Sequence, residues 1–222
     1  MTRFTEAALD GLDEPVRRYF GHAIAGGARM HRGVRVRMTG RIKVGVWLPF
    51  EADEQCDGTS FEWRARVGRL LLVVDRYANG AGSTEGRLFG RRRLFGSHDA
   101  DTVRSAAGRA ALEAIWTPMS LLPERGVSWR AEASDHVVAT WDVPPERPEV
   151  HIRMDDDGAV KSAWARRWSA TGYRPCGCEV HAERRWDDLI VPSRLTVGWG
   201  FGTPDYEPFF RAEIRALAAA NY

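Results

Sequence analysis

Residues 34–46 read VRVRMTGRIKVGV, and an apolar side chain stands at nearly every second position. A period of two is that of a β-strand, whose successive side chains point to opposite faces. One face would carry Val, Met and Ile, and the other would carry Arg, Lys and Thr. Because one face would pack on a core while the other meets water, this stretch predicts an antiparallel sheet with one buried side.

The same alternation returns along most of the chain and indicates roughly ten to twelve strands. Dipeptides that accept positive φ separate several of the runs, as Asn79-Gly80 does. A sheet this large must curl, because each strand twists against the next. Its apolar face would then enclose a helix, a ligand or both. The other alternating runs are 61–67, 150–154, 160–168, 195–201 and 206–214.

Two segments have the pattern of helices. The first covers about residues 14–25 and stops at a pair of glycines. The second covers about residues 101–116 and is ended by Pro118. The apolar segment 115–123 is bounded by prolines. It would be either a plug or lid over the mouth of the sheet or an ordinary connection packed on the core.

No linker, repeat or low-complexity tract divides the chain, so residues 1–222 are expected to form a single domain. The predicted fold class is α+β and mainly β. It consists of one large curved antiparallel sheet, a half-barrel or barrel, with an N-terminal helix and a mid-chain helix and plug on the concave face. Strands would occupy about residues 33–96 and 127–216, on either side of a helix and plug at about 101–123.

The 32 basic and 30 acidic residues give a net charge of +2, which predicts no broad attraction to nucleic acid. The N-terminus, Met1–Glu6, lacks the apolar run of a signal peptide. The longest apolar run, Leu70–Val74, is far too short to span a bilayer. Because this run is apolar on both faces, we expect a helix to cover the sheet there. The expectation is a cytoplasmic protein with no integral membrane segment, whose oligomeric state the sequence leaves open.

Motifs of well-known chemistry are missing from the sequence. It has no Walker loop, G-x-G-x-x-G, H-E-x-x-H or G-x-S-x-G, so we expect no cofactor. Cys56, Cys176 and Cys178 form neither a disulfide framework nor a metal-ligand set. None of the six His pairs with another at ligand spacing, so we expect no metal site.

Nine Trp and nine Phe are many for a chain of this length. Core filling would account for most of them, but aromatic side chains also make good walls for a ligand site. The candidate ligand-binding residues are Trp47, Phe50, Trp63, Tyr77, Trp116, Met119, Trp164, Trp168 and Trp199.

Glu54 is the first polar candidate, because it shares a strand face with Phe50 and Ala52. If that face is inward, desolvation would raise the pKa of the carboxyl group and suit it to proton transfer. The alternative, which we favour from the sequence, is a salt bridge with Arg64 or Arg66 across the hairpin.

Asp75, Tyr77 and Arg166 complete the candidate catalytic set. Asp75 and Tyr77 lie on one face after an apolar run. They would bind the head group of a ligand, or cap the helix that packs there. Arg166 stands between Trp164 and Trp168 on one face, where it would stack or hold an anion. The alternative is that the tryptophan face points outward and the strand is an edge.

Several short motifs follow one another along about residues 12–215. They are Glu14–Phe20, Trp47-x-Pro49-Phe50-x-Ala52, Gln55, Phe61-x-Trp63-x-Ala65, Asp75-x-Tyr77-x-x-Gly80-x-Gly82, Glu113-x-x-Trp116-x-Pro118 and Val191-Pro192. In this order they resemble a family of bacterial proteins of unknown function.

That family is similar in layout to the lipoprotein carriers typified by LolA and LolB. In those carriers an N-terminal helix precedes a half-barrel sheet, and mid-chain helices plug its concave face. The resemblance implies binding of a hydrophobic ligand and offers no catalytic residues to carry over. This sequence departs from the carriers because it shows no export signal or lipobox.

Three functions remain open at this point. The first is binding of a hydrophobic small molecule, such as a lipid, acyl or polyketide-like chain, in an aromatic-rich cavity. The second is a cofactor-independent cyclase or isomerase that orients an apolar substrate in the same cavity and uses one acid or base. The third is a structural or partner-binding domain with no cavity.

Overall fold

A computed structural model describes residues 2–220 and contains one antiparallel sheet of 13 strands. The helices are η1 (Glu6–Leu9), α1 (Glu14–Ala23), α2 (Ala100–Glu113), η2 (Ala114–Trp116), η3 (Pro118–Leu121) and η4 (Pro123–Arg125). The strands are β1 (Gly33–Val44), β2 (Val46–Cys56), β3 (Phe61–Val67), β4 (Leu71–Ala78), β5 (Ala81–Leu88), β6 (Arg92–Ser97), β7 (Ser128–Ala133), β8 (His136–Thr140), β9 (Glu149–Met154), β10 (Val160–Ser169), β11 (Gly172–Trp186), β12 (Leu189–Trp199) and β13 (Glu207–Ala220).

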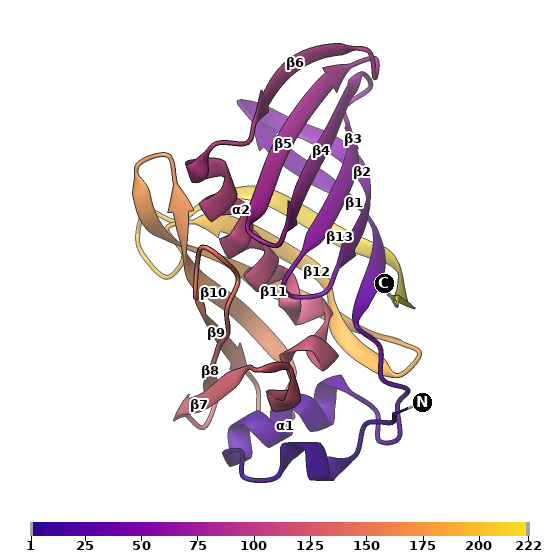
Figure 1. Ribbon diagram of the computed structural model, residues 1–222, viewed down its shortest axis with the longest axis vertical. Coiled ribbons are helices and arrows are strands. Elements are labelled where there is room, and N and C mark those ends of the chain that lie inside the picture. The colour runs from indigo at the N-terminus through magenta and orange to yellow at the C-terminus, as the bar shows by residue number, and fades with distance from the viewer. Residues whose placement is uncertain (1, 221–222) are drawn as a thin grey trace.

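The strand order is β6-β5-β4-β3-β2-β1-β13-β12-β11-β10-β9-β8-β7. The chain therefore runs outward from β1 to one edge, crosses the concave side through α2 and the short helices, and returns from the other edge until β13 pairs with β1. The sheet is open and curved, as Figure 1 shows. Its two edge strands, β6 and β7, are mostly exposed and carry little apolar alternation, so the predicted count of ten to twelve strands was too low.

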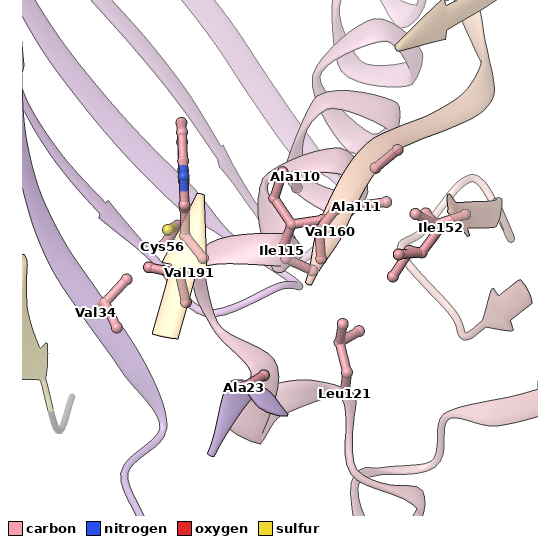
Figure 2. Packing of buried hydrophobic residues seen from close by; sticks show 14 of the residues in the cluster. Ala23, Val34, Cys56, Ala110, Ala111, Ile115, Leu121, Ile152, Val160 and Val191 are labelled. Atoms are coloured by element: carbon pink, nitrogen blue, oxygen red, sulfur yellow. The ribbon is translucent and has the colours of Figure 1, made fainter. Parts of the chain in front are cut away.

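The concave face holds the core of the molecule. α2 lies inside the curve of the sheet and packs on β10, β5 and β4, while α1 lies across one end near β7 (Figure 1). Figure 2 shows the side chains of Ala110, Ala111 and Ile115 between Val191 and Ile152, which belong to separate strands. The helix predicted from the pattern of residues 101–116 thus corresponds to α2, which packs on the concave face of the sheet.

The plug segment is fully packed. Trp116, Met119, Leu121 and Leu122 are each 4% exposed or less. Trp116 lies on η2, Met119 and Leu121 lie on η3, and Leu122 joins η3 to η4, so the segment forms 3-10 turns rather than an extension of α2. The prediction of a mid-chain helix and plug on the concave face is therefore confirmed.

Alternation within the strands is also confirmed where it was clearest. Val34, Val36 and Met38 are buried on β1. The expectation for 70–74 was wrong in part, because α2 covers only the inner face of β4 and leaves Leu72 39% exposed on the outer face. No helix within residues 2–220 is both long and apolar enough to cross a bilayer.

Candidate functional site

A cavity of about 190 Å³ lies between α2 and the concave face of the sheet. Both halves of the sheet contribute to it, since its lining comes from β1, β3 and β4 on one side and from β10 to β13 on the other. Most of the lining is apolar, and the charged groups come from α2, β4 and β10. The lining residues are Ile42, Trp63, Asp75, Arg109, Leu112, Glu113, Ile115, Trp116, Arg167, Gly177, Cys178, Leu195, Val197, Phe209 and Phe210.

Arg109, on the sheet-facing side of α2, is the centre of an acidic cluster. Its Nη1 donates to Asp75 Oδ2 at 2.8 Å and its Nε donates to Glu113 Oε1 at 2.5 Å. Its Nη2 lies 3.8 Å from Glu54 Oε1. Three carboxyl groups thus surround one guanidinium group whose side chain is 18% exposed. A buried charge needs such partners, because its desolvation would otherwise be costly.

Aromatic rings on β3 complete the surroundings of Arg109. The guanidinium carbon lies 4.3 Å from the centroid of Phe61 and 5.2 Å from that of Trp63. Cation–π attraction therefore adds to the ion pairs and fixes the plane of the guanidinium group. Thr84 on β5 donates from its hydroxyl to Asp75 Oδ1, which orients the remaining carboxylate oxygen toward Arg109.

Glu54 is the most deeply buried of the three acidic residues, with 1% of its side chain exposed. Neither of its oxygens, nor Glu113 Oε2, has a hydrogen-bond donor among residues 2–220. A proton held between the two carboxyl groups would satisfy both of them. Burial and the negative charge of Glu113 raise the pKa of Glu54 well above its ordinary value, while Arg109 opposes the shift.

The salt bridge expected between Glu54 and Arg64 or Arg66 is wrong. Arg64 lies on the opposite face of the hairpin and pairs with Glu62, at 2.5 Å from Nε to Oε1. Glu54 points inward because it lies opposite Val36 and Trp63 in neighbouring strands, and both of those side chains are buried. The less favoured interpretation of the sequence, a carboxyl group in an apolar wall, describes its environment.

Arg167 reaches the cavity from β10, on the other wall. Its Nε donates to the carbonyl oxygen of Ser105 on α2 at 2.8 Å, and its guanidinium carbon lies 5.3 Å from the ring centroid of Trp199. Gly108 makes room for its stem, because a Cβ at that position would lie 2.8 Å from Arg167 Cγ. Within residues 2–220, Arg167 takes part in no ion pair, in contrast to Arg109.

The thiols near this wall are free and buried. Cys178 lines the cavity, and burial raises its pKa to about 12. Burial also raises the pKa of Cys176, although Arg167 opposes that shift. Thiols that remain protonated are poor nucleophiles, so these groups contribute apolar surface rather than covalent chemistry.

The four predicted catalytic candidates fall in different places. Glu54 and Asp75 come together around Arg109. Tyr77 lies outside the cavity, where its hydroxyl donates to the carbonyl oxygen of Pro144 and holds that loop against β4. Arg166 is exposed and does not line the cavity, and its guanidinium carbon lies 5.9 Å from the ring centroid of Tyr173.

The predicted aromatic wall is also divided. Trp63 and Trp116 line the cavity, and Phe50 supports it by stacking on Phe210 at 4.8 Å between centroids. Trp199 lies under Arg167. The other candidates lie elsewhere: Met119 is in the core, Trp47 lies beside Arg211, Trp164 stacks on His151, and Trp168 lies under Arg104.

Three functional candidates were missed in the sequence. Arg109 and Glu113 stand four residues apart on α2, a spacing that was available as a signal for one helix face. Arg167 adjoins the predicted Arg166 but belongs to the opposite strand face. Outside the cavity, His136 Nε2 and His151 Nδ1 meet at 3.0 Å across β8 and β9, a pairing that cannot be read from their separation in sequence.

Comparisons with known proteins place the chain in a family. The model of a family of unknown function, DUF6544, matches residues 2–212. A LolA superfamily protein from Nitrosomonas europaea shares 7% identity over 87% of this chain and 89% of its own, with a TM-score of 0.47. A DUF1329 family protein from Desulfovibrio piger shares 10% identity over 98% of this chain and 94% of its own, with a TM-score of 0.42. No protein of curated function matches the sequence.

Proposed function

Because the chain belongs to the DUF6544 family of unknown function, family membership brings no activity with it, and we propose from the cavity that the protein binds a hydrophobic small molecule. The ligand would be lipid-like, acyl or polyketide-like, and its apolar part would lie between α2 and the sheet. One observation carries the proposal: the cavity is apolar along most of its lining and has fixed charged groups at two places. Such a combination binds amphipathic molecules, because the apolar walls give affinity and the polar groups give orientation.

The walls that would contact the apolar part come from both halves of the sheet. Trp63 and Phe210 lie 6.3 Å apart between centroids in an edge-on arrangement, and Phe50 stacks behind Phe210. Leu195 and Val197 on β12 supply aliphatic surface opposite them. Burying a chain against these side chains would contribute about 0.8 kcal/mol for each methylene group removed from water.

A second candidate function is cofactor-independent catalysis in the same cavity, as a cyclase or isomerase. The observation that favours it is Glu54, a buried carboxyl group without a donor and with a raised pKa, beside Glu113, which lines the cavity. A carboxyl pair that shares one proton can deliver it to a substrate or accept one from it. Turnover of a bound apolar molecule, lost in Glu113→Gln, would establish this activity.

Filling the cavity tests the binding proposal. Val197→Phe places a ring in the cavity, and Val74→Phe places the same ring on the outer face of β4 as a matched control. Titration with 1-decanol, followed by tryptophan fluorescence from Trp63 and Trp116 and by native mass spectrometry, measures binding. We expect the wild type and Val74→Phe to bind alike, and Val197→Phe to bind at least about tenfold more weakly.

Equal binding by all three proteins would show that decanol sits elsewhere, and absence of binding to the wild type would refute the proposal. Circular dichroism of each variant verifies that the fold is retained, since overpacking in a core costs about 1–3 kcal/mol.

A further inference from the structure

Resting on the proposed function, we infer that the ligand is a singly charged anion, an amphipath whose carboxylate binds the guanidinium group of Arg167. This assigns a chemical class to the head group and a residue to its recognition.

Arg167 lacks an ionic partner within the protein. Arg167 is half-buried and lines the cavity, yet no carboxylate pairs with it among residues 2–220. Charged side chains that leave water are normally paired, because desolvation of a single charge is costly. On the other wall Arg109 follows this rule with three carboxyl groups. A ligand carboxylate would supply to Arg167 the partner that the protein itself supplies to Arg109.

Arg167 is also held in place before a ligand arrives. Its Nε is bonded to the Ser105 carbonyl oxygen, its stem passes against Gly108, and the ring of Trp199 lies 5.3 Å from its guanidinium carbon. The side chain also hydrogen-bonds to the thiol of Cys176, and the remaining N–H donors of the guanidinium group can meet a ligand. A preorganised guanidinium group loses little side-chain entropy on binding, and its planar donors match a carboxylate.

The charged groups of the cavity also limit how many negative charges the head group of the ligand can carry. Asp75 and Glu113 line the same cavity, and each shares Arg109 with the other. A dianionic head group such as a phosphate monoester would meet their repulsion, which is strong in a site with little water. Among the residues that line the cavity, Arg167 is the positively charged one without a carboxylate partner, and a carboxylate brings one negative charge to it. Arg174 lies opposite Arg167 on β11, 5.9 Å from the ring of Trp199, and is not part of the lining. A cationic head group would instead require Arg167 to remain unpaired beside it.

Three probes with the same ten-carbon chain separate these possibilities: decanoate, 1-decanol and decylamine, each titrated at pH 8. The variants are Arg167→Met, which keeps the stem and removes the charge, and Arg166→Met, the same change on the neighbouring exposed residue. For the wild type and Arg166→Met we expect decanoate to bind about tenfold or more tightly than decanol, and decylamine to bind more weakly than decanol. Arg167→Met should bind decanoate and decanol alike.

The outcomes also distinguish this inference from the function on which it rests. If decanol binds the wild type as tightly as decanoate, the head-group assignment fails and the apolar binding site stands. Preference for decylamine would overturn the assignment in favour of a cation held by Asp75 and Glu113. If none of the probes binds, the proposed function itself fails. Because the comparison of probes in the wild type needs no variant, the result does not depend on Arg167→Met folding.

Discussion

The two arginines that face the cavity from opposite sides, Arg109 on α2 and Arg167 on β10, have contrasting surroundings. Arg109 is held by Asp75, Glu113 and Glu54. Arg167 has a carbonyl oxygen, the thiol of Cys176, an aromatic ring and a glycine, and no carboxylate among the described residues. The same side chain therefore serves two purposes in one cavity.

The exposure of a charged side chain therefore does not by itself identify a binding group. Arg109 is already paired with carboxylates of the protein, so its removal would chiefly leave Asp75 and Glu113 without their counter-charge. Arg167 retains unused donors, so its removal would chiefly affect a ligand. Stability and binding should thus separate between the two walls.

The largest effect should follow Arg109→Met. Removing the guanidinium group leaves the carboxylates of Asp75 and Glu113 without a counter-charge, and breaking a buried ion pair in this way costs about 3–5 kcal/mol. Arg167→Met should lower the free energy of unfolding by about 1–2 kcal/mol, since it breaks a bond to a carbonyl oxygen and one to the Cys176 thiol, and no ion pair. Urea unfolding at pH 7 measures both. Equal losses in the two variants would contradict the division of roles.

An intermediate effect should follow Glu54→Gln, and its sign depends on pH. The raised pKa of Glu54 means that the folded protein holds a proton there that the unfolded chain releases above about pH 4.3. The stabilising contribution of this proton is fully present below that pH and is lost as the pH rises through the folded-state pKa. Gln cannot lose a proton and can donate to Glu113. We therefore expect the variant to exceed the wild type in stability by about 1–3 kcal/mol at pH 8.

Unfolding curves measured from pH 4 to pH 9 test this sign. Glu51→Gln is the control, because Glu51 is exposed on the same strand and should change the pH dependence little. A stability difference between the wild type and Glu54→Gln that stays constant from about pH 5 to pH 9 would show that the pKa of Glu54 is not raised and that Glu54 is ionised in the folded protein.

The smallest effect should follow Gly108→Ala. The new Cβ would press on the stem of Arg167, while alanine is the better helix former by about 0.8–1.0 kcal/mol. The change in stability should be near zero, and decanoate affinity should fall by about three- to tenfold. Gly21→Ala in α1 has open space around it and should give the helix gain without the loss of affinity. Unchanged affinity in Gly108→Ala would mean that the position of Arg167 is unimportant.

The sheet follows from local patterns, and so does the grouping of Glu54 with Phe50 and Ala52 on one strand face, but which face points inward does not. A strand has a period of two, so the burial of Val36 and Trp63 determines where their partners in the neighbouring strands point. Arg109 could not be located this way. Its role depends on which face of α2 meets which strands, and that arrangement is set by packing between segments far apart in the sequence.

At Arg166 and Arg167 the sequence pattern indicated the wrong inner face of the strand. Trp164 and Trp168 made the even-numbered face of 160–168 look like the inner one. In the structure the small residues Ala163 and Ala165 face inward, fully buried, because α2 packs closely on β10. Close approach of a helix to a sheet requires small side chains, so the large aromatic groups lie elsewhere, and Arg167 rather than its neighbour enters the cavity.

A crystal structure of the protein with decanoate brominated at its terminal carbon tests the central claim most directly. The anomalous signal of bromine locates the end of the chain, and the electron density locates the head. We expect bromine inside the cavity near Phe210 and the carboxylate within hydrogen-bond distance of the Arg167 guanidinium group. Bromine outside the cavity, with the space between α2 and the sheet empty, would contradict it.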